Sequence, residues 1–467
     1  MKGMHGKSEQ QRPSGLEEAH GLHETHRERA DTTVAYRRAF DSAQPDPGRA
    51  VLHVDFVAKE VEWEFRPGRE TRAWTFNGTV PGPTIQARVG DVLELSLTNH
   101  LIEPTAIHWH GLRVPAAMDG TDIVQRPVQP GERFVYRFRL PDAGTFWYHP
   151  HVNETVQLER GLYGALIVRA DDEPQFDGER ILLFDDIQLD RKGQIRPPGW
   201  WVEKHNGRGG TTRLVNGRQE PVLYMAAGQI ERWRMVNAAS ACYILFSIGG
   251  KPFKIIGTDG GLITAPVVAT KILLAPAERV DILVGPFAEG DILRVESLKH
   301  SRGKIGIPKR ERFATLEVGQ ASPSMAVVPT LLRDLEPLVT GPVTANRQVT
   351  FDWKLDRQHG VQFLINQESH HRADPVCVGE LQVWDIINRT PVDHPFHLHG
   401  FFFQVVEVNG RKPPYLSWED TVNIPAKKRV RIAWKPDDRP GEWMYHCHIL
   451  EHHAAGMMAH FEVISRQ

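Results

Sequence analysis

The stretch His446-Cys447-His448, which is followed by His452 and Met457, carries more information than any other part of this chain. Side chains alternate between the two faces of a β-strand, so His446 and His448 are expected to point one way and Cys447 the other. Cys447, His452 and Met457 provide a thiolate, an imidazole and a thioether. These are ligand types of a blue-copper electron-transfer centre that still lacks one imidazole. One short strand can therefore serve two metal sites at once.

Composition limits the classes of protein to be considered. The chain has 467 residues, which is enough for about three domains of ordinary size. Its 33 prolines and 40 glycines are typical of a turn-rich β protein. The formal net charge of -2 indicates no nucleic-acid partner, and no apolar run is long enough for membrane insertion. Three cysteines exclude a disulfide framework, since at most Cys242 and Cys377 remain to pair.

Residues 1–50 are predicted to form a polar N-terminal extension without an apolar signal core. Arg37-Arg38 is not followed by a hydrophobic stretch, so no twin-arginine signal is expected. The chain is therefore either a mature extracytoplasmic form, which we favour, or a cytoplasmic protein. The segment contains several histidines, but its polar composition predicts a disordered tail rather than a copper-collecting arm.

An internal repeat divides the rest of the chain into three copies. Each copy opens with a glycine turn and an alternating strand that ends in asparagine, at residues 90–99, 228–237 and 379–388. A proline and a basic residue open a later strand, as in Pro276-Ala277-Glu278-Arg279. Short strands at regular spacing with turn signals favour an all-β fold of Greek-key β-sandwich domains. The predicted domains span 51–170, 180–318 and 345–467, and residues 319–344 are predicted to be a linker.

Four His-x-His pairs lie at equivalent positions of the first and third copies, and each presents two imidazoles on one strand face. The pairs are His108-Trp109-His110, His149-Pro150-His151, His397-Leu398-His399 and His446-Cys447-His448. Eight imidazoles on two domains can converge only where those domains meet, so a cluster of several metals is predicted there. The middle copy has no such pair, and its predicted role is that of a spacer.

His394 supplies the imidazole that the site around Cys447 still lacked. It lies three residues before His397, and odd spacing on a strand places two side chains on opposite faces. His394 is therefore expected to point with Cys447 into the third domain. The set His394, Cys447, His452 and Met457 is the trigonal ligand set with a weak axial methionine that suits copper, whereas methionine is a poor ligand for structural zinc.

These segments resemble the four copper motifs of the multicopper oxidases over about residues 51–467, and the pattern is most similar to the three-domain bacterial laccases and copper-efflux oxidases. The resemblance implies cupredoxin-like domains and four copper ions: one type 1, one type 2 and two type 3. It assigns His394, Cys447, His452 and Met457 to type 1 copper, and His108 and His397 to type 2 copper. It assigns to the type 3 pair His110, His149, His151, His399, His446 and His448.

The family reaction implies two partners, a small reducing substrate and dioxygen. Four one-electron oxidations of the substrate are coupled to the reduction of dioxygen to two waters. The resemblance implies that electrons enter at the edge of His452. They would then pass through Cys447 to His446 and His448. An axial methionine implies a lower potential than an uncoordinated position, which favours easily oxidised substrates.

Water formation requires protons, and the resemblance suggests which residues supply them. Asp119 lies eleven residues after His108 and matches the family's acidic residue near the type 2 water, although a turn aspartate in Met118-Asp119-Gly120 would look the same. Bacterial relatives carry a proton-feeding glutamate directly after the residue that corresponds to His452, where this chain has His453. We therefore expect His453 or Glu451 to replace that relay.

The methionine content bears on the substrate. Copper-efflux oxidases bind cuprous ion with a methionine-rich insertion, and no such insertion occurs between the third-domain motifs of this chain. A laccase acting on phenols or aromatic amines is therefore expected, with cuprous or ferrous oxidation as the alternative. Three further readings are a copper nitrite reductase, a copper-storage or electron-transfer protein, and a structural or division-associated relative without copper ligands. The complete ligand set argues against all three.

Overall fold

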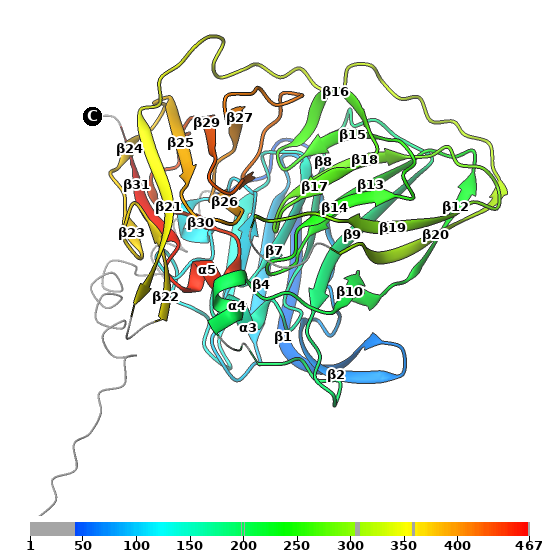
Figure 1. The fold of residues 1–467 in the computed structure, drawn as a ribbon, viewed down its shortest axis with the longest axis horizontal. Helices are drawn as coiled ribbons and strands as arrows, with labels where there is room; N and C mark the ends of the chain where they lie inside the picture. Colours follow the sequence, from blue (N-terminus) through cyan, green and yellow to red (C-terminus); the bar gives the residue numbers. More distant parts are fainter. Residues whose placement is uncertain (1–42, 198, 200, 304–308, 357–359, 466–467) are drawn as a thin grey trace, which may run out of the picture.

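The computed structural model describes residues 43–197, 199, 201–303, 309–356 and 360–465, and these are mostly β-structure (Figure 1). Six sheets form three cupredoxin-like domains, and the helices are few and short. The predicted fold class is therefore confirmed. Most of the predicted N-terminal extension lies outside the described residues. Among the described helices, none is long and apolar enough to cross a membrane.

The first domain consists of two four-stranded sheets with the orders β2-β1-β4-β6 and β3-β8-β7-β5. Strand β4 shows why the sequence folds this way: Leu93, Leu95 and Leu97 point into the core, while Glu94 between them pairs with Arg137. The strands are β1 (Val51–Arg66), β2 (Arg69–Phe76), β3 (Ile85–Arg88), β4 (Val92–Asn99), β5 (His108–His110), β6 (Arg133–Arg139), β7 (Gly144–His149) and β8 (Gly164–Arg169).

The second domain has a seven-stranded sheet of order β11-β10-β9-β13-β18-β15-β16 and a five-stranded sheet of order β12-β20-β19-β14-β17. Its strands are β9 (Gly178–Ile187), β10 (Thr212–Val215), β11 (Arg218–Gln219), β12 (Val222–Ala227), β13 (Glu231–Asn237), β14 (Ile244–Ile248), β15 (Phe253–Thr258), β16 (Gly261–Ala269), β17 (Ile272–Leu274), β18 (Arg279–Val284), β19 (Ile292–Leu298) and β20 (Glu311–Ala321).

The third domain has sheets of order β22-β21-β25-β29-β27 and β23-β31-β30-β26-β28, and β24 also pairs with β31. Its strands are β21 (Arg347–Asp356), β22 (Gly360–Ile365), β23 (His371–Arg372), β24 (Val376–Cys377), β25 (Gln382–Asn388), β26 (His394–Leu398), β27 (Phe403–Val408), β28 (Thr421–Ile424), β29 (Arg429–Trp434), β30 (Gly441–Cys447) and β31 (Met458–Ile464). The helices of the molecule are η1 (Ala116–Met118), α3 (Glu154–Gln157), α4 (Trp201–Asn206) and α5 (Leu450–Ala454).

The asparagine that ends each repeated strand has the same structural role in all three domains. The buried side chain of Asn99 donates hydrogen bonds to the carbonyls of Glu103 and Val128. Asn237 and Asn388 each donate to two backbone carbonyls at the equivalent places. These bonds satisfy buried carbonyl groups in the loop that leads to the next strand. In the outer domains that next strand carries the first histidine pair.

The segment between β20 and β21 contains no helix or strand and runs along the top of the molecule in Figure 1. Backbone N–H of Leu332 donates to the Thr264 carbonyl of the second domain, and N–H of Leu338 donates to the Gln404 side chain of the third. The segment therefore spans both domains. The domain boundaries given above remain predictions. All three cysteines are free, so Cys242 and Cys377 form no bridge.

A partly buried ion network joins the first two domains. Glu179 on β9 accepts hydrogen bonds from Arg169 of the first domain at 2.9 Å and from Arg234 on β13 at 2.8 Å. Burial acts to raise the pKa of Glu179, but Arg169 and Arg234 outweigh it and lower that pKa to about 2.

Replacing Glu179 with Gln is expected to lower the free energy of unfolding near neutral pH by about 1 kcal/mol. The folded-state pKa of about 2 lies below the value near 4.3 of an unfolded glutamate. The stabilisation is therefore complete above the unfolded pKa and is lost as the pH falls towards 2. Urea unfolding at neutral and acidic pH measures this: the two proteins should differ at neutral pH and converge in acid. Glu62→Gln, at an exposed position on β1, is the control.

Candidate metal centre

Three ligand atoms of the predicted type 1 set meet inside the third domain. The Sγ atom of Cys447 lies 3.4 Å from Nδ1 of His394 and 3.7 Å from Nδ1 of His452, and the two nitrogens are 3.0 Å apart. His394 comes from β26, Cys447 from β30 and His452 from α5, and all three side chains are fully buried. The structure thus brings together one thiol and two imidazoles in one buried pocket.

Apolar side chains surround this pocket. Phe363 stacks on His452 with ring centroids 3.9 Å apart. Met457 is buried in the same hydrophobic core as Cys447, and its carbonyl accepts a hydrogen bond from the Cys447 N–H. N–H of Ile449 points at the sulfur, 3.4 Å away. A hydrophobic shell with one N–H at the sulfur is an environment that tunes the potential of a thiolate-bound metal.

The protonation states in the pocket favour a metal ion. Burial raises the pKa of the Cys447 thiol far above its usual range, lowers the pKa of His394 to about 3, and lowers that of His452 well below its usual value. The imidazoles are therefore neutral and able to bind a metal. A thiolate at this position requires a nearby cation, because the protein alone disfavours the charged sulfur.

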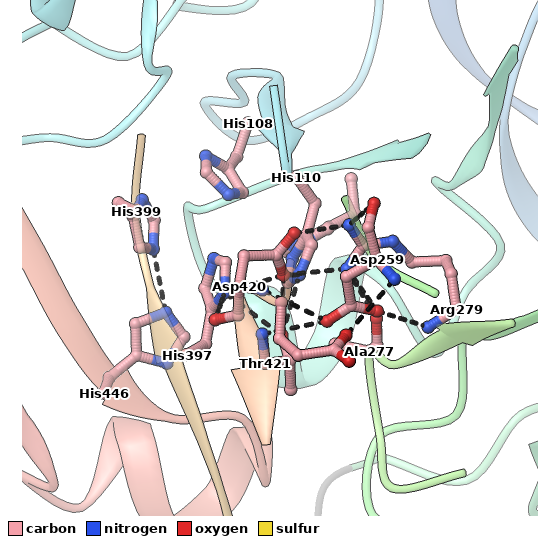
Figure 2. A network of polar contacts seen from close by, with 12 residues as sticks. His108, His110, Asp259, Ala277, Arg279, His397, His399, Asp420, Thr421 and His446 are labelled. Carbon is pink, nitrogen blue, oxygen red and sulfur yellow. Dashed lines mark hydrogen bonds and ion pairs between the residues drawn. The ribbon is translucent and has the colours of Figure 1, made fainter. Parts of the chain in front are cut away.

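The eight histidines of the four His-x-His pairs converge between the first and third domains. Figure 2 shows His108, His110, His397, His399 and His446 of this cluster. Nε2 of His446 lies 2.9 Å from Nε2 of His399 and 3.4 Å from Nε2 of His151. In a second group, Nδ1 of His110 lies 3.5 Å from Nε2 of His149. The rings of His110 and His448 are 5.1 Å apart. Every one of the eight is buried.

One nitrogen of most of these rings is held by an oxygen acceptor, so the other nitrogen is turned into the cluster. Nδ1 donates to a backbone carbonyl in His108, His149, His397 and His446. His110 is reversed, because its Nε2 donates to a carboxylate oxygen of Asp420 at 3.0 Å. A hydrogen bond to one nitrogen fixes which nitrogen is left for a metal.

Several inward nitrogens have no hydrogen-bond partner among the described residues. They are Nε2 of His108, Nε2 of His397 and both ring nitrogens of His448. Burial lowers the pKa of most rings in the cluster well below the usual histidine value, and repulsion between neighbouring rings adds to this in several of them. Buried polar atoms without partners are rare in proteins. Neutral imidazoles that converge in this way fit bound metal ions, and the two clusters match the type 1 and trinuclear copper sites of multicopper oxidases.

Asp119 connects two rings of the cluster. Its Oδ2 accepts a hydrogen bond from Nδ1 of His399 at 2.8 Å, and its backbone carbonyl accepts one from Nδ1 of His108 at 2.9 Å. The residue follows η1 and is 2% exposed. Asp119 therefore orients one histidine from each outer domain.

The second domain reaches the cluster through Arg279, whose place in a repeated motif gave no sign of this contact. The fully buried guanidinium of Arg279 donates to both carboxylate oxygens of Asp420, and its backbone N–H donates to Asp259 (Figure 2). Asp420 in turn accepts the hydrogen bond from His110. Burial alone would raise the pKa of Asp420, but Arg279 and His110 hold it well below its usual range. The middle domain thus holds Asp420, a hydrogen-bond partner of the histidine cluster, in place, in addition to spacing the first and third domains.

Gly111 makes this contact possible. It follows the pair His108-Trp109-His110 with a φ of 86°, in the left-handed region that favours glycine. A Cβ atom at this position would lie 2.6 Å from Oδ2 of Asp420 and would also overlap the Arg279 guanidinium. The repeated glycine therefore gives Arg279 and Asp420 space beside the histidine strand.

His453 and Glu451 point in different directions from α5. The ring of His453 stacks on His446 at 4.3 Å, and its Nδ1 lies next to Oε1 of Glu154 of α3. Glu154 also lies 3.8 Å from Nδ1 of His151. Glu451 instead accepts a hydrogen bond from the backbone N–H of Arg208 in the second domain. Glu154 was missed by sequence reasoning, although its position three residues after His151 was the available signal.

The edge of His452 is not open to a substrate. Nε2 of His452 donates to the carbonyl of His205 at 3.0 Å, and the ring is fully buried. His205 belongs to α4, a short helix of the second domain that packs against α5 (Figure 1). The expected contact between substrate and His452 is therefore replaced here by a contact with the protein itself.

Comparison with known proteins assigns all three matched segments of the chain to the same family. Three family models described as multicopper oxidase match residues 57–173, 199–290 and 342–467. The chain is 31% identical over 440 residues to the multicopper oxidase MmcO of Mycobacterium tuberculosis, which covers 84% of this chain and 83% of that protein. It is also 31% identical over 425 residues to the cell division protein FtsP of Xenorhabdus nematophila, with 84% and 85% covered.

Solved structures share the whole fold. A metallo-oxidase from Campylobacter jejuni superposes with a TM-score of 0.80 at 30% identity, covering 91% of this chain and 98% of that one. A laccase from Pediococcus acidilactici superposes with a TM-score of 0.75 at 27% identity, covering 90% and 92%.

Replacing Cys447 with Ser is expected to remove one of about four bound coppers and the intense visible absorption of a copper–thiolate bond. The hydroxyl is a poor substitute for the thiolate, whereas the histidine cluster keeps all its nitrogens. Copper quantitation and the visible spectrum of the purified protein measure both effects. Cys377→Ser, on β24, should leave both unchanged. A variant at Cys447 that kept the full absorption would contradict the assignment of this pocket.

Proposed function

Because the chain belongs to the multicopper oxidase family, we propose that it is a laccase-type enzyme. It would oxidise phenols or aromatic amines by single electrons and reduce dioxygen to two waters. The observation that carries this proposal is the shared segment at the end of β30. Cys447 faces the pocket with His394 and His452, while His446 faces the histidine cluster. One strand thus connects an electron-accepting site to an oxygen-reducing site.

We assign the ligands as follows. His394, Cys447 and His452, with Met457 as a weaker fourth ligand, would hold type 1 copper, and His108 and His397 would hold type 2 copper. The inward nitrogens support two type 3 sets, one of His110, His149 and His448 and one of His151, His399 and His446. Copper bound at these sites would supply one-electron transfer from the substrate to dioxygen.

The chain provides a short route between the two sites. Cys447 is covalently joined to His446 and His448, and Nδ1 of His446 donates to the Cys447 carbonyl at 2.9 Å. An electron accepted at the sulfur can therefore reach the cluster through few bonds. The buried surroundings exclude water from this route and keep the rings in fixed orientations.

Two groups could supply the protons that water formation consumes, and we propose a role for each. Asp119 orients His108 and His399 and would hold a proton beside them. His453, paired with Glu154, lies against His446 and His151. This pair places a carboxylate and an imidazole where bacterial relatives have a glutamate. Of the two residues expected from the sequence, His453 is the better placed, because Glu451 is bonded to the backbone of Arg208.

Replacing His453 with Ala or Glu154 with Gln is expected to lower kcat roughly tenfold or more, since a positioned proton donor contributes at least that much. The visible spectrum and copper content should stay as in the unmodified protein, because neither residue is an assigned ligand. Oxygen consumption at saturating phenol measures kcat. Glu451→Gln is the comparison and should change kcat much less. Unchanged turnover of the His453 variant across the pH range would exclude the pair as the relay.

A metallo-oxidase acting on cuprous or ferrous ion is the second candidate. The similarity to the metallo-oxidase of Campylobacter jejuni favours it. Against it, the side chain that stacks on His452 is the aromatic Phe363, and the residue over its edge is His205. Neither residue provides the thioether that cuprous ion prefers as a ligand. The similarity to FtsP keeps a non-enzymatic role as a third outcome.

Turnover on a methoxyphenol compared with turnover on cuprous and ferrous ion separates these candidates. We expect kcat/KM to be highest for the methoxyphenol, with four phenols consumed for each dioxygen in the balanced reaction. An oxygen electrode with the copper-loaded protein provides the measurement. A clear preference for a metal ion would support the second candidate, and a copper-loaded protein that consumes no oxygen with any donor would support a non-enzymatic role.

A further inference from the structure

The type 1 pocket is closed above His452 by α4, so an electron donor must act through another group. The Nε2 atom of His452 is taken by the His205 carbonyl, and neither His452 nor Phe363, which stacks on it, is more than 1% exposed. A donor that reduces this site therefore has to contact residues further out.

An aromatic chain leads from His452 to the surface. Phe363 stacks on His452, with ring centroids 3.9 Å apart and an interplanar angle of 25°. The His205 ring is stacked on Phe363 at 6.2 Å and meets the edge of Trp353 at 5.2 Å. His205 also reaches His452 directly through its carbonyl. Trp353 is thus joined to the predicted copper ligand by two routes: three successive ring contacts, or one ring contact and one hydrogen bond.

The backbone explains why Trp353 lies at the outer end of this chain. Trp353 on β21 is the direct cross-strand partner of Phe363 on β22, so the two side chains share one face of the sheet. Alternate residues of β21 follow this face outward from the pocket. Phe351 is fully buried, Trp353 is 36% exposed and Leu355 is 74% exposed. An apolar strip therefore runs from the buried site to solvent, and Trp353 is where it first becomes accessible.

We propose that Trp353 is the docking residue for planar aromatic donors, which stack on its exposed ring and reduce the type 1 site through His205 and His452. This inference rests on the proposed function and names its substrate site. A phenol that stacks there loses one electron to the copper centre and its hydroxyl proton to solvent, leaving a phenoxyl radical. Trp353 and His205 undergo no net oxidation. Four such events supply the four electrons that reduce one dioxygen.

The strip selects for the shape and polarity of the donor. Aromatic rings pair favourably with an exposed indole, and stacking adds to the apolar area that is buried. A hydrated metal ion gains nothing from such a surface, because the strip presents no thioether or carboxylate in Trp353 and Leu355. The docking residue therefore accounts for a preference for aromatic donors that does not depend on contact with His452.

The test uses Trp353→Ala and Trp353→Phe, with Tyr224→Ala as the matched control. Tyr224 is an aromatic residue that is 66% exposed on β12 of the second domain. The first readout is binding of 2-methoxyphenol to the copper-free protein by isothermal calorimetry, which does not depend on turnover. We expect Trp353→Ala to weaken binding about tenfold, Trp353→Phe to retain most of it, and Tyr224→Ala to match the unmodified protein.

The second readout is steady-state oxidation of 2-methoxyphenol by the copper-loaded proteins. For Trp353→Ala the KM should rise about tenfold and kcat should fall less, with the visible copper–thiolate absorption retained. Unchanged dissociation constant and KM in this variant would overturn the docking assignment. A different result would show that the proposed function is wrong. In that case the unmodified, copper-loaded protein would consume no oxygen with 2-methoxyphenol, whether or not the variants bind it.

Discussion

The buried guanidinium of Arg279 is the contact on which the arrangement of the three domains depends. A charge removed from water costs several kcal/mol unless it is paired and fully hydrogen-bonded. Arg279 meets this condition only when Asp420 of the third domain and Asp259 of its own domain are both in place, with the Thr145 carbonyl of the first domain accepting a further bond. A shift of the third domain would remove the Asp420 carboxylate from Arg279, and a shift of the first would remove a hydrogen bond, so the assembled state is specific.

The pairing of Arg279 with Asp420 also orients histidine rings of the cluster for metal binding. Asp420 holds Nε2 of His110 through a carboxylate oxygen and Nδ1 of His397 through its carbonyl, so one acidic residue orients rings from two domains. Hydrogen bonds from the outer nitrogen fix the tautomer and direct the inner nitrogen. The middle domain, which has none of the assigned ligands, therefore influences the cluster through Arg279 and Asp420. The predicted role of the middle domain as a spacer therefore describes only part of what it does.

Sequence patterns predicted which side chains share a strand face, and from this the histidine cluster between two domains, but they missed the other residues that contact the two sites from neighbouring domains. Alternation along β-strands placed Cys447 with His394 and away from His446, and the repeat predicted three similar β domains; the fold and the copper cofactors are confirmed. The ligand roles of single residues remain proposals. Glu154, Arg279 and His205 were not found, because each acts on a residue of another domain, far away in the sequence. Strand periodicity holds no information on such contacts.

Helix α5 shows how one short element combines these constraints. Its consecutive residues Glu451, His452 and His453 contact the second domain, the type 1 pocket and the first domain. A helix advances about 100° per residue, so three neighbours necessarily face three directions. The role of His453 therefore depends on a residue of another domain. Its ring lies against His446, and the carboxylate of Glu154 lies beside it. An acidic group that the sequence lacks directly after His452 is thus present beside His453, on Glu154 across the interface.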